Sequence, residues 1–138
     1  MDLWYKMKRI GIIGSRRRNS EKDFEQLLKW FNLIYEPGDC IVSGGCPKGG
    51  DKFAEQLAKM LMMDIIELKD GDIPETNDSH TIYIHYPQWE KHGKIAGFYR
   101  NTFIARDSDI LIALIAKDRK GGTEDTLRKH EGVQIIIP

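Results

Sequence analysis

Three glycine-rich segments each follow a short apolar run and precede a helical pattern. They are Gly14-Ser15-Arg16, then Ser43-Gly44-Gly45 continuing to Gly49-Gly50-Asp51, and Gly121-Gly122-Thr123. Glycine permits sharp turns and lets an anion approach the backbone amides closely. The helix start behind each segment offers N–H donors and the positive end of the helix dipole. One such loop is a weak signal, because glycine also simply makes turns. Three together favour a phosphate-binding site.

Neither standard nucleotide-binding fingerprint is present. Residues 11–16 lack the third glycine of the GxGxxG pattern, and no GxxxxGK[ST] sequence occurs. These differences argue against an ordinary dinucleotide-binding dehydrogenase site and against a P-loop NTPase.

Arginines accompany these loops. Arg16 directly follows the first glycine loop and is well placed for a bidentate contact with an anion. We interpret the next two residues, Arg17 and Arg18, as a solvated charge run. Arg100 and Asn101 lie in a helical segment whose other face is apolar, and spacing alone indicates no more than a solvent-facing arginine there.

The segments that position these residues alternate between strand and helix. Strands are predicted over 9–13, 40–42, 65–68, 109–116 and 133–137, and helices over about 20–34, 51–61, 94–106 and 124–130. Runs of β-branched residues without polar alternation are typical of strands buried on both faces. The order predicts an α/β fold, a three-layer Rossmann-like domain. Its mainly parallel sheet has about five strands, with helices on both faces.

Residues 70–80 interrupt this alternation. They are polar, acidic and turn-rich, which indicates a surface excursion, and 81–86 alternates enough for a short strand suited to a sheet edge. For residues 70–84 as a whole, a lid over the site and a plain surface loop both remain open.

Composition suits one globular domain over residues 1–138, with 41% hydrophobic and 30% charged residues. The longest apolar stretch, 110–116, is far short of a membrane span, and MDLWYKMKR lacks the apolar run of a signal peptide. We therefore expect a cytoplasmic protein with no membrane partner. The 21 basic and 21 acidic residues cancel, which argues against nucleic acid as the main partner.

Cysteine and histidine give no sign of a metal site. Cys40 and Cys46 lack metal-ligand spacing and are interpreted as a reduced, structural pair. The histidines at positions 80, 85, 92 and 130 form neither an HxxxH nor an HxH pattern. No metal and no cofactor are expected.

The segments taken together resemble the SLOG superfamily, which groups the cytokinin-activating LOG phosphoribohydrolases with the DNA-processing protein DprA. The likeness is strongest to its small stand-alone YspA-like members. The matching segments are IGIIGSR (10–16), IVSGGCPKGGDKFAE (41–55), WEKHGKIAGFYRN (89–101), SDILIAL (108–114) and KGGTEDTLR (120–128). They cover nearly all of the chain apart from 70–84. The resemblance implies a Rossmann-like domain that binds a nucleotide or an ADP-ribose-like molecule at these loops.

The resemblance also assigns residues to the site. Arg100 matches an arginine that, in LOG enzymes, assists cleavage of the bond between base and ribose 5′-phosphate, although Asn101 replaces the lysine that follows it there. The ligand-binding residues that the resemblance implies are Gly14, Ser15, Arg16, Ser43, Gly44, Gly45, Gly49, Asp51, Asn101, Gly122 and Thr123.

The catalytic carboxylate is the position where the chain departs from the LOG pattern PGGxGTxxE. Aligning Gly122-Thr123 with the GT of that pattern places Asp125 and Thr126 where LOG has two glutamates. Asp125 is then the candidate acid that stabilises an oxocarbenium-like state, and Glu124 takes this role if the loop is shifted. The proline and one glycine of the pattern are absent.

Two functions of different class follow. The favoured one is a binding or sensing module for a nucleotide or nucleotide-derived ligand, without turnover. The alternative is a LOG-like phosphoribohydrolase that cleaves the N-glycosidic bond of nucleoside 5′-monophosphates, with Arg100 and either Asp125 or Glu124 as catalytic residues. A DprA-like role on single-stranded DNA is weaker, because the chain has no basic excess. LOG relatives are commonly dimers and the apolar helix 94–106 suits a homodimer, but the sequence leaves the oligomeric state open.

Overall fold

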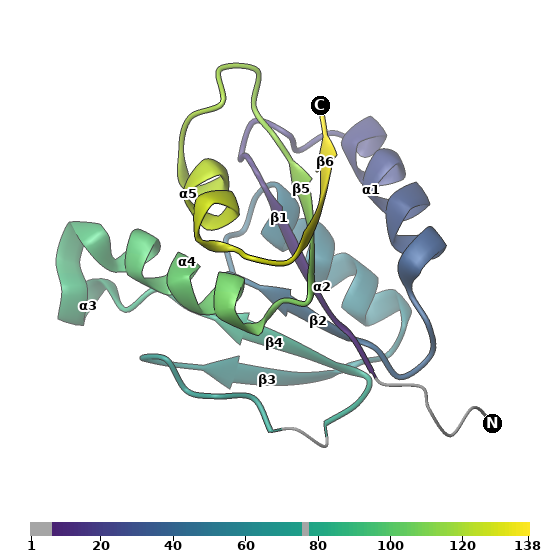
Figure 1. Cartoon of the computed structure of the whole chain (residues 1–138), viewed down its shortest axis with the longest axis horizontal. Coiled ribbons are helices and arrows are strands. Elements are labelled where there is room, and N and C mark those ends of the chain that lie inside the picture. The colour runs from purple at the N-terminus through teal and green to yellow at the C-terminus, as the bar shows by residue number, and fades with distance from the viewer. Residues whose placement is uncertain (1–6, 76–77) are drawn as a thin grey trace.

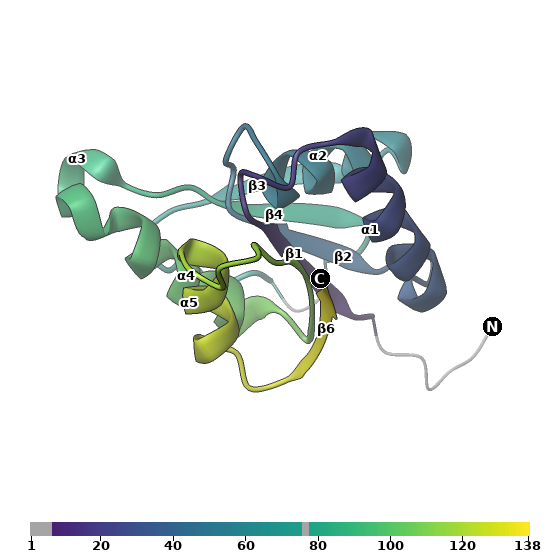
Figure 2. The same ribbon diagram turned by 90° about the horizontal axis from the view of Figure 1, so that it is seen from above.

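The computed structural model describes residues 7–75 and 78–138, and its six-stranded sheet lies between two layers of helices (Figures 1 and 2). The strands are β1 (Arg9–Gly14), β2 (Cys40–Ser43), β3 (Asp64–Leu68), β4 (Thr81–His85), β5 (Ile110–Leu114) and β6 (Val133–Ile137). All neighbouring strands are parallel, in the order β3-β4-β2-β1-β5-β6. The predicted three-layer α/β class is confirmed. The prediction about a leader segment falls on residues 1–6, which lie outside the described residues, as do 76–77 of the excursion.

Helices cover both faces of this sheet. They are α1 (Glu21–Ile34), α2 (Gly50–Met60), α3 (Trp89–His92), the 3-10 turn η1 (Gly93–Ile95), α4 (Ala96–Asp107) and α5 (Gly122–Lys129). Figure 2 shows α1 and α2 on one face and α4 and α5 on the other, while α3 projects past the carboxyl ends of the strands in Figure 1. The helix predicted over 94–106 corresponds to α4, and the short helix α3 before it was not predicted. None of the helices in the described part of the chain is long and apolar enough to cross a membrane.

The strand predicted at a sheet edge over 81–86 is an interior strand, and this accounts for the sixth strand. β4 lies between β2 and β3, pairs with both, and is buried along its whole length. Its polar side chains are satisfied by distant partners: Tyr83 donates to Asp78 over 2.6 Å, and His85 Nε2 lies 2.5 Å from Asp107. The edge prediction was wrong because alternating polar residues indicate an exposed face only where such partners are missing.

The connections after β1 and β5 diverge, and this positions the site. These two strands are neighbours, yet β1 leads to α1 on one face of the sheet while β5 leads to α5 on the other. A crevice at the carboxyl ends of the strands is the usual ligand site at such a divergence in an open α/β sheet.

The segment between β1 and α1 is tied down on both sides. Ser20 caps α1, because its Oγ accepts from Asp23 N while Asp23 accepts from Ser20 N, each over 3.1 Å. Asn19 Oδ1 instead accepts from Gly49 N over 2.9 Å, which joins the first glycine loop to the second. Arg18 donates to Ile115 O and Ile137 O and is partly buried, so its interpretation as a solvated charge was wrong.

The start of α2 lies directly against the backbone of β1. A Cβ added to Gly50 would lie 2.3 Å from Ile13 C and 2.4 Å from Gly14 N. Only glycine permits this approach, so Gly50 of the second glycine loop serves packing between α2 and β1. The contact sets how far the first turn of α2, which carries Asp51, stands from the end of β1.

Candidate functional site

A cavity of about 430 Å³ opens at the carboxyl edge of the sheet, where the chain diverges after β1 and β5. This volume is within the range of small-molecule binding sites. Its walls come from the loop after β1, the start of α5 and the α3–α4 segment. Eight of the predicted site residues line it: Gly14, Ser15, Arg16, Asp51, Arg100, Asn101, Gly122 and Thr123.

Most of the second glycine loop lies behind the cavity wall. Ser43, Gly44, Gly45 and Gly49 are absent from the lining, while Cys46 and Asp51 of the same segment belong to it. Arg100 Nη1 donates to Gly44 O, and a Cβ on Gly44 would lie 2.5 Å from that nitrogen. Gly49 has φ +74°, and a Cβ there would lie 2.5 Å from Ser15 O. The missing side chains therefore let other cavity residues pack over this loop.

Asp51 organises the same loop from the first turn of α2. Its Oδ2 accepts from Cys46 N over 3.0 Å, and its Oδ1 accepts from Gly44 N over 3.3 Å and from Ser43 Oγ over 3.4 Å. Burial raises the pKa of Asp51, while attraction to Arg100 and these hydrogen bonds oppose the rise. The cavity thus contains a carboxyl group whose proton affinity exceeds that of an ordinary aspartate.

Arg100 is held in place by three acceptors. Its Nε donates to Asn101 Oδ1 over 3.0 Å, and its Nη1 donates to Gly44 O and, over 3.5 Å, to His85 O. Burial lowers the pKa of Arg100, and attraction to Asp51 opposes this. Within residues 7–75 and 78–138 its Nη2 donates to no protein acceptor. The guanidinium is therefore fixed in orientation with one nitrogen available to a ligand.

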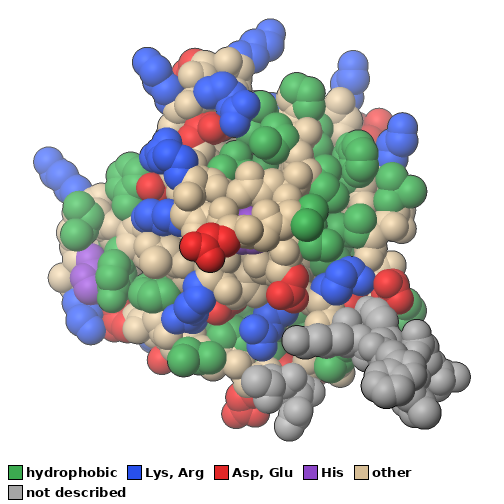
Figure 3. Space-filling model, viewed as in Figure 1, with side chains coloured by type: hydrophobic (Ala, Val, Ile, Leu, Met, Phe, Trp, Pro, Cys, Tyr) green, Lys and Arg blue, Asp and Glu red, His purple; other side chains and the backbone are tan. Residues whose placement is uncertain are grey.

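The cavity lining is strongly basic although the chain as a whole is neutral. Five basic side chains and one acidic side chain, Asp51, line it, and the basic residues are Arg16, Arg17, Lys94, Arg100 and Lys120. Arg17, interpreted as solvated, is exposed and pairs with Asp118 over 2.8 Å across the two diverging loops. In Figure 3, Lys and Arg side chains surround the loop that precedes α5, at the top of the molecule. Such a lining attracts anions.

The N-terminus of α5 is open to this basic cavity. Its N-cap, Gly121, has φ +108° and provides no side-chain hydrogen bond. The first-turn amides, which have no partner within a helix, belong to residues that include the cavity residues Gly122 and Thr123. The start of α1, in contrast, is capped by the side chain of Ser20. The N-cap of α2, Gly49, also provides no side-chain hydrogen bond, but neither Gly49 nor Gly50 lines the cavity. Of the three glycine loops, the third therefore offers the clearest anion-binding amides.

The two carboxylates predicted as catalytic acids do not line the cavity. Asp125 is buried, and its Oδ2 accepts from Lys129 Nζ over 2.8 Å and from Asn101 Nδ2 over 3.2 Å. Glu124 pairs with Arg119 over 2.8 Å. In this arrangement Asp125 fixes Asn101 between α4 and α5, and Asp51 is the acid that lies beside Arg100.

Sequence reasoning missed part of the lining. Trp89, Gly97, Phe98 and Lys94 come from the α3–α4 segment, and Lys120 precedes α5. The aromatic pair belongs to the matched segment 89–101, but without the strand order nothing showed that it faces the glycine loops. Within the described residues, no three His, Cys, Asp or Glu side chains lie close enough together to hold a metal ion.

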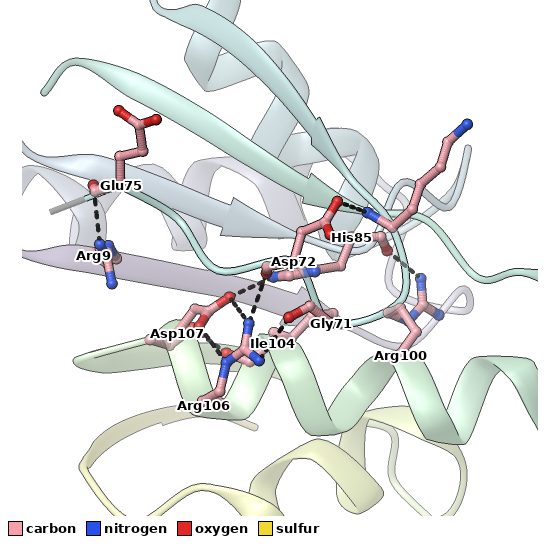
Figure 4. A network of polar contacts seen from close by, with 11 residues as sticks. Arg9, Gly71, Asp72, Glu75, His85, Arg100, Ile104, Arg106 and Asp107 are labelled. Carbon is pink, nitrogen blue, oxygen red and sulfur yellow. Dashed lines mark hydrogen bonds and ion pairs between the residues drawn. The ribbon is translucent and has the colours of Figure 1, made fainter. Parts of the chain in front are cut away.

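A buried carboxylate, Asp107, joins β4 to the end of α4 (Figure 4). Asp107 lies 2.5 Å from His85 Nε2 and accepts from Arg106 Nε over 2.7 Å. Arg106 also donates to the carbonyls of Gly71 and Asp72, over 3.0 and 2.9 Å. The excursion is thereby fixed to the far end of α4. None of the described residues between 70 and 84 lines the cavity, which favours the surface-loop interpretation over a lid.

Replacing Asp107 by asparagine should lower the free energy of unfolding at pH 7 by about 3 kcal/mol, because it removes a buried carboxylate that is hydrogen-bonded to His85 and Arg106. Burial alone would raise the pKa of Asp107, but hydrogen bonds from His85 and Arg106 lower it below its ordinary value. The stabilisation is therefore present above the unfolded-state pKa and is lost as pH falls through the lowered one. Urea unfolding from pH 7 to pH 3 should show the two proteins converging in stability.

Asp70→Asn is the matched control, since Asp70 is an exposed acid that pairs with Lys91 and His92. This variant should change stability little. A difference between Asp107→Asn and the unchanged protein that does not vary with pH would contradict the role given to the Asp107 charge.

The chain matches no protein-family model, no curated protein and no solved structure. Its function is therefore inferred from the residues of the cavity.

Proposed function

We propose that this protein binds a nucleotide or nucleotide-derived ligand, such as a nucleoside monophosphate or an ADP-ribose-like molecule, as a binding or sensing module. The observation that carries the proposal is the cavity beside the uncapped start of α5, lined by five basic side chains and one acidic side chain. Resemblance to the SLOG superfamily points to the same ligand class.

The phosphate is expected at the α5 end of the cavity. There the amides at Gly122 and Thr123 would donate to its oxygens, and Arg16 and Lys120 would supply charge. Each charge-assisted hydrogen bond contributes about 1.5–3 kcal/mol. Arg100 and Asn101 lie further along the same wall and would contact the sugar.

Binding without turnover is favoured because, among the described residues, the cavity lining holds no carboxylate without hydrogen-bond partners. Asp125 and Glu124 are each paired outside it, and Asp51 accepts three hydrogen bonds from its own loop. A carboxylate used in this way has little freedom to approach a reacting carbon.

A phosphoribohydrolase remains the second candidate, and one observation favours it. Asp51 lines the cavity with a raised pKa beside Arg100, which is the kind of environment that tunes catalytic acids. Asp51, and not Asp125 or Glu124, would then serve as the carboxyl group. In that reaction water adds across the N-glycosidic bond, leaving a hydroxyl on the ribose carbon and a proton on the released base.

Incubation with nucleoside monophosphates and ADP-ribose separates the two functions. We expect an increase in melting temperature with at least one ligand and no free base by chromatography. If the unchanged protein releases free base and neither Arg100→Gln nor Asp51→Asn does, the protein is a hydrolase and the binding-module proposal is wrong. Neither stabilisation nor product with any of these ligands would contradict both.

A further inference from the structure

Two large aromatic side chains line the cavity without being buried by the protein. Trp89 of α3 is 54% exposed and Phe98 of α4 is 51% exposed, and both belong to the cavity wall. When a ligand covers exposed apolar surface in a concave site, the free energy of the complex falls.

A glycine, Gly97, lies between the aromatic and the charged side chains. A Cβ added to Gly97 would lie 3.5 Å from Trp89 Cη2 and 4.0 Å from Arg100 Nη2. The bare backbone of Gly97 therefore lies between the indole ring and the guanidinium. A flat group on the aromatic side would adjoin a polar group at Arg100.

Short interactions hold the aromatic wall in place. Lys91 and His92 of α3 contact Asp70 over 2.8 and 3.1 Å, and Lys129 Nζ donates to Phe98 O over 2.7 Å. These contacts connect the backbone next to Trp89 to the excursion and that of Phe98 to α5, while both rings stay exposed.

We propose that Trp89 and Phe98 form the subsite for the base of the ligand, so that the cavity selects nucleoside phosphates over sugar phosphates and inorganic phosphate. The inference rests on the proposed nucleotide function. A base has a flat π face that stacks on aromatic rings, and such stacking increases affinity by about ten- to hundredfold per base. Stacking alone does not distinguish one base from another, so selection is for the presence of a base and not for its identity.

Calorimetric titrations with 5′-AMP and ribose 5-phosphate test this directly. We expect the unchanged protein to bind AMP about a hundredfold more tightly than ribose 5-phosphate. Trp89→Ala and Phe98→Ala should each weaken AMP binding by about tenfold and leave ribose 5-phosphate binding unchanged. Trp30→Ala is the control: Trp30 is 42% exposed on α1, outside the cavity wall, and its loss should change neither affinity.

The outcomes distinguish this inference from the function on which it rests. Equal affinities for AMP and ribose 5-phosphate, or an affinity ratio that Trp89→Ala and Phe98→Ala leave unchanged, would overturn the base subsite while nucleotide binding stands. A change in oligomeric state in these variants with an unchanged ratio would show that the aromatic pair contacts a second copy instead, and would also overturn it. If neither compound binds, the proposed function itself fails.

Discussion

Arg100→Gln should weaken 5′-AMP binding by about a hundredfold, equivalent to about 2.7 kcal/mol. The guanidinium is held by Gly44 O, His85 O and Asn101 Oδ1, so a ligand meets it already oriented. Glutamine retains an N–H donor but loses the charge. Removing one partner of a buried, charge-assisted contact costs about 2–5 kcal/mol. Calorimetry of the variant and of the unchanged protein measures the loss.

The same substitution should change how stability depends on pH. Attraction to Arg100 opposes the effect of burial on Asp51, so its removal raises the pKa of Asp51 further. A group whose folded-state pKa is raised stabilises the fold below its unfolded-state pKa and loses that stabilisation as pH rises through the folded value. Arg100→Gln should therefore fall further below the unchanged protein in stability as pH rises through the raised pKa that Asp51 has in the unchanged protein.

Arg128→Gln is the matched control for both effects. Arg128 is an exposed arginine of α5 that lies 3.6 Å from Asp125 and does not line the cavity. Its replacement should leave AMP affinity within about twofold, since surface pairs contribute little. If Arg100→Gln binds AMP as tightly as Arg128→Gln does, Arg100 does not contact the ligand.

Gly50→Ala should lower the free energy of unfolding by about 3 kcal/mol or more. The added methyl group would meet the backbone at Ile13 and Gly14 within 2.4 Å, and backbone in the middle of a sheet cannot give way as a side chain does. Overpacking of a well-packed interior typically costs about 1–3 kcal/mol, and here both partners are rigid. For a chain of this size the melting temperature should fall by about 10 °C.

Gly97→Ala tests whether the effect at Gly50 comes from crowding. Gly97 also lies in a helix, but a Cβ there meets only Trp89 and Arg100 at ordinary contact distances. Alanine should raise stability by about 0.5–1 kcal/mol, because glycine is costly inside a helix. If both variants changed the melting temperature by the same amount and in the same direction, the close approach of α2 to β1 would not be what glycine serves at position 50.

Periodicity was sufficient to predict the layers of this fold, and the glycine loops were sufficient to predict the edge of the sheet at which the cavity opens. Parallel strands all end at the same edge of a sheet, so Gly14-Ser15-Arg16 and Gly122-Thr123 were expected to lie there. The α/β class followed from apolar runs and helical spacing alone.

Which residues of the three glycine loops line the cavity could not be predicted from glycine content and periodicity. Which residues of a loop face the cavity depends on the side chains that pack on that loop from other elements. Arg100 of α4 donates to Gly44 O, so Gly44 lies behind Arg100 instead of beside a ligand. The surroundings of the candidate acid were not predictable either: pattern alignment selected Asp125, and its carboxylate accepts hydrogen bonds from Lys129 and Asn101 outside the cavity. Asp51, seven residues after Gly44, lies in the cavity because α2 starts against β1 at Gly50.

The most direct test that the cavity recognises a phosphate is to titrate the protein calorimetrically with 5′-AMP and, separately, with adenosine. We expect AMP to bind at least a hundredfold more tightly than adenosine, because adenosine offers nothing to the α5 amides or to the basic lining. The affinity for AMP should fall as salt increases from 50 to 300 mM, since the attraction is electrostatic. Adenosine binding as tightly as AMP, or no detectable heat from AMP at either salt concentration, would contradict a phosphate-binding site in this protein.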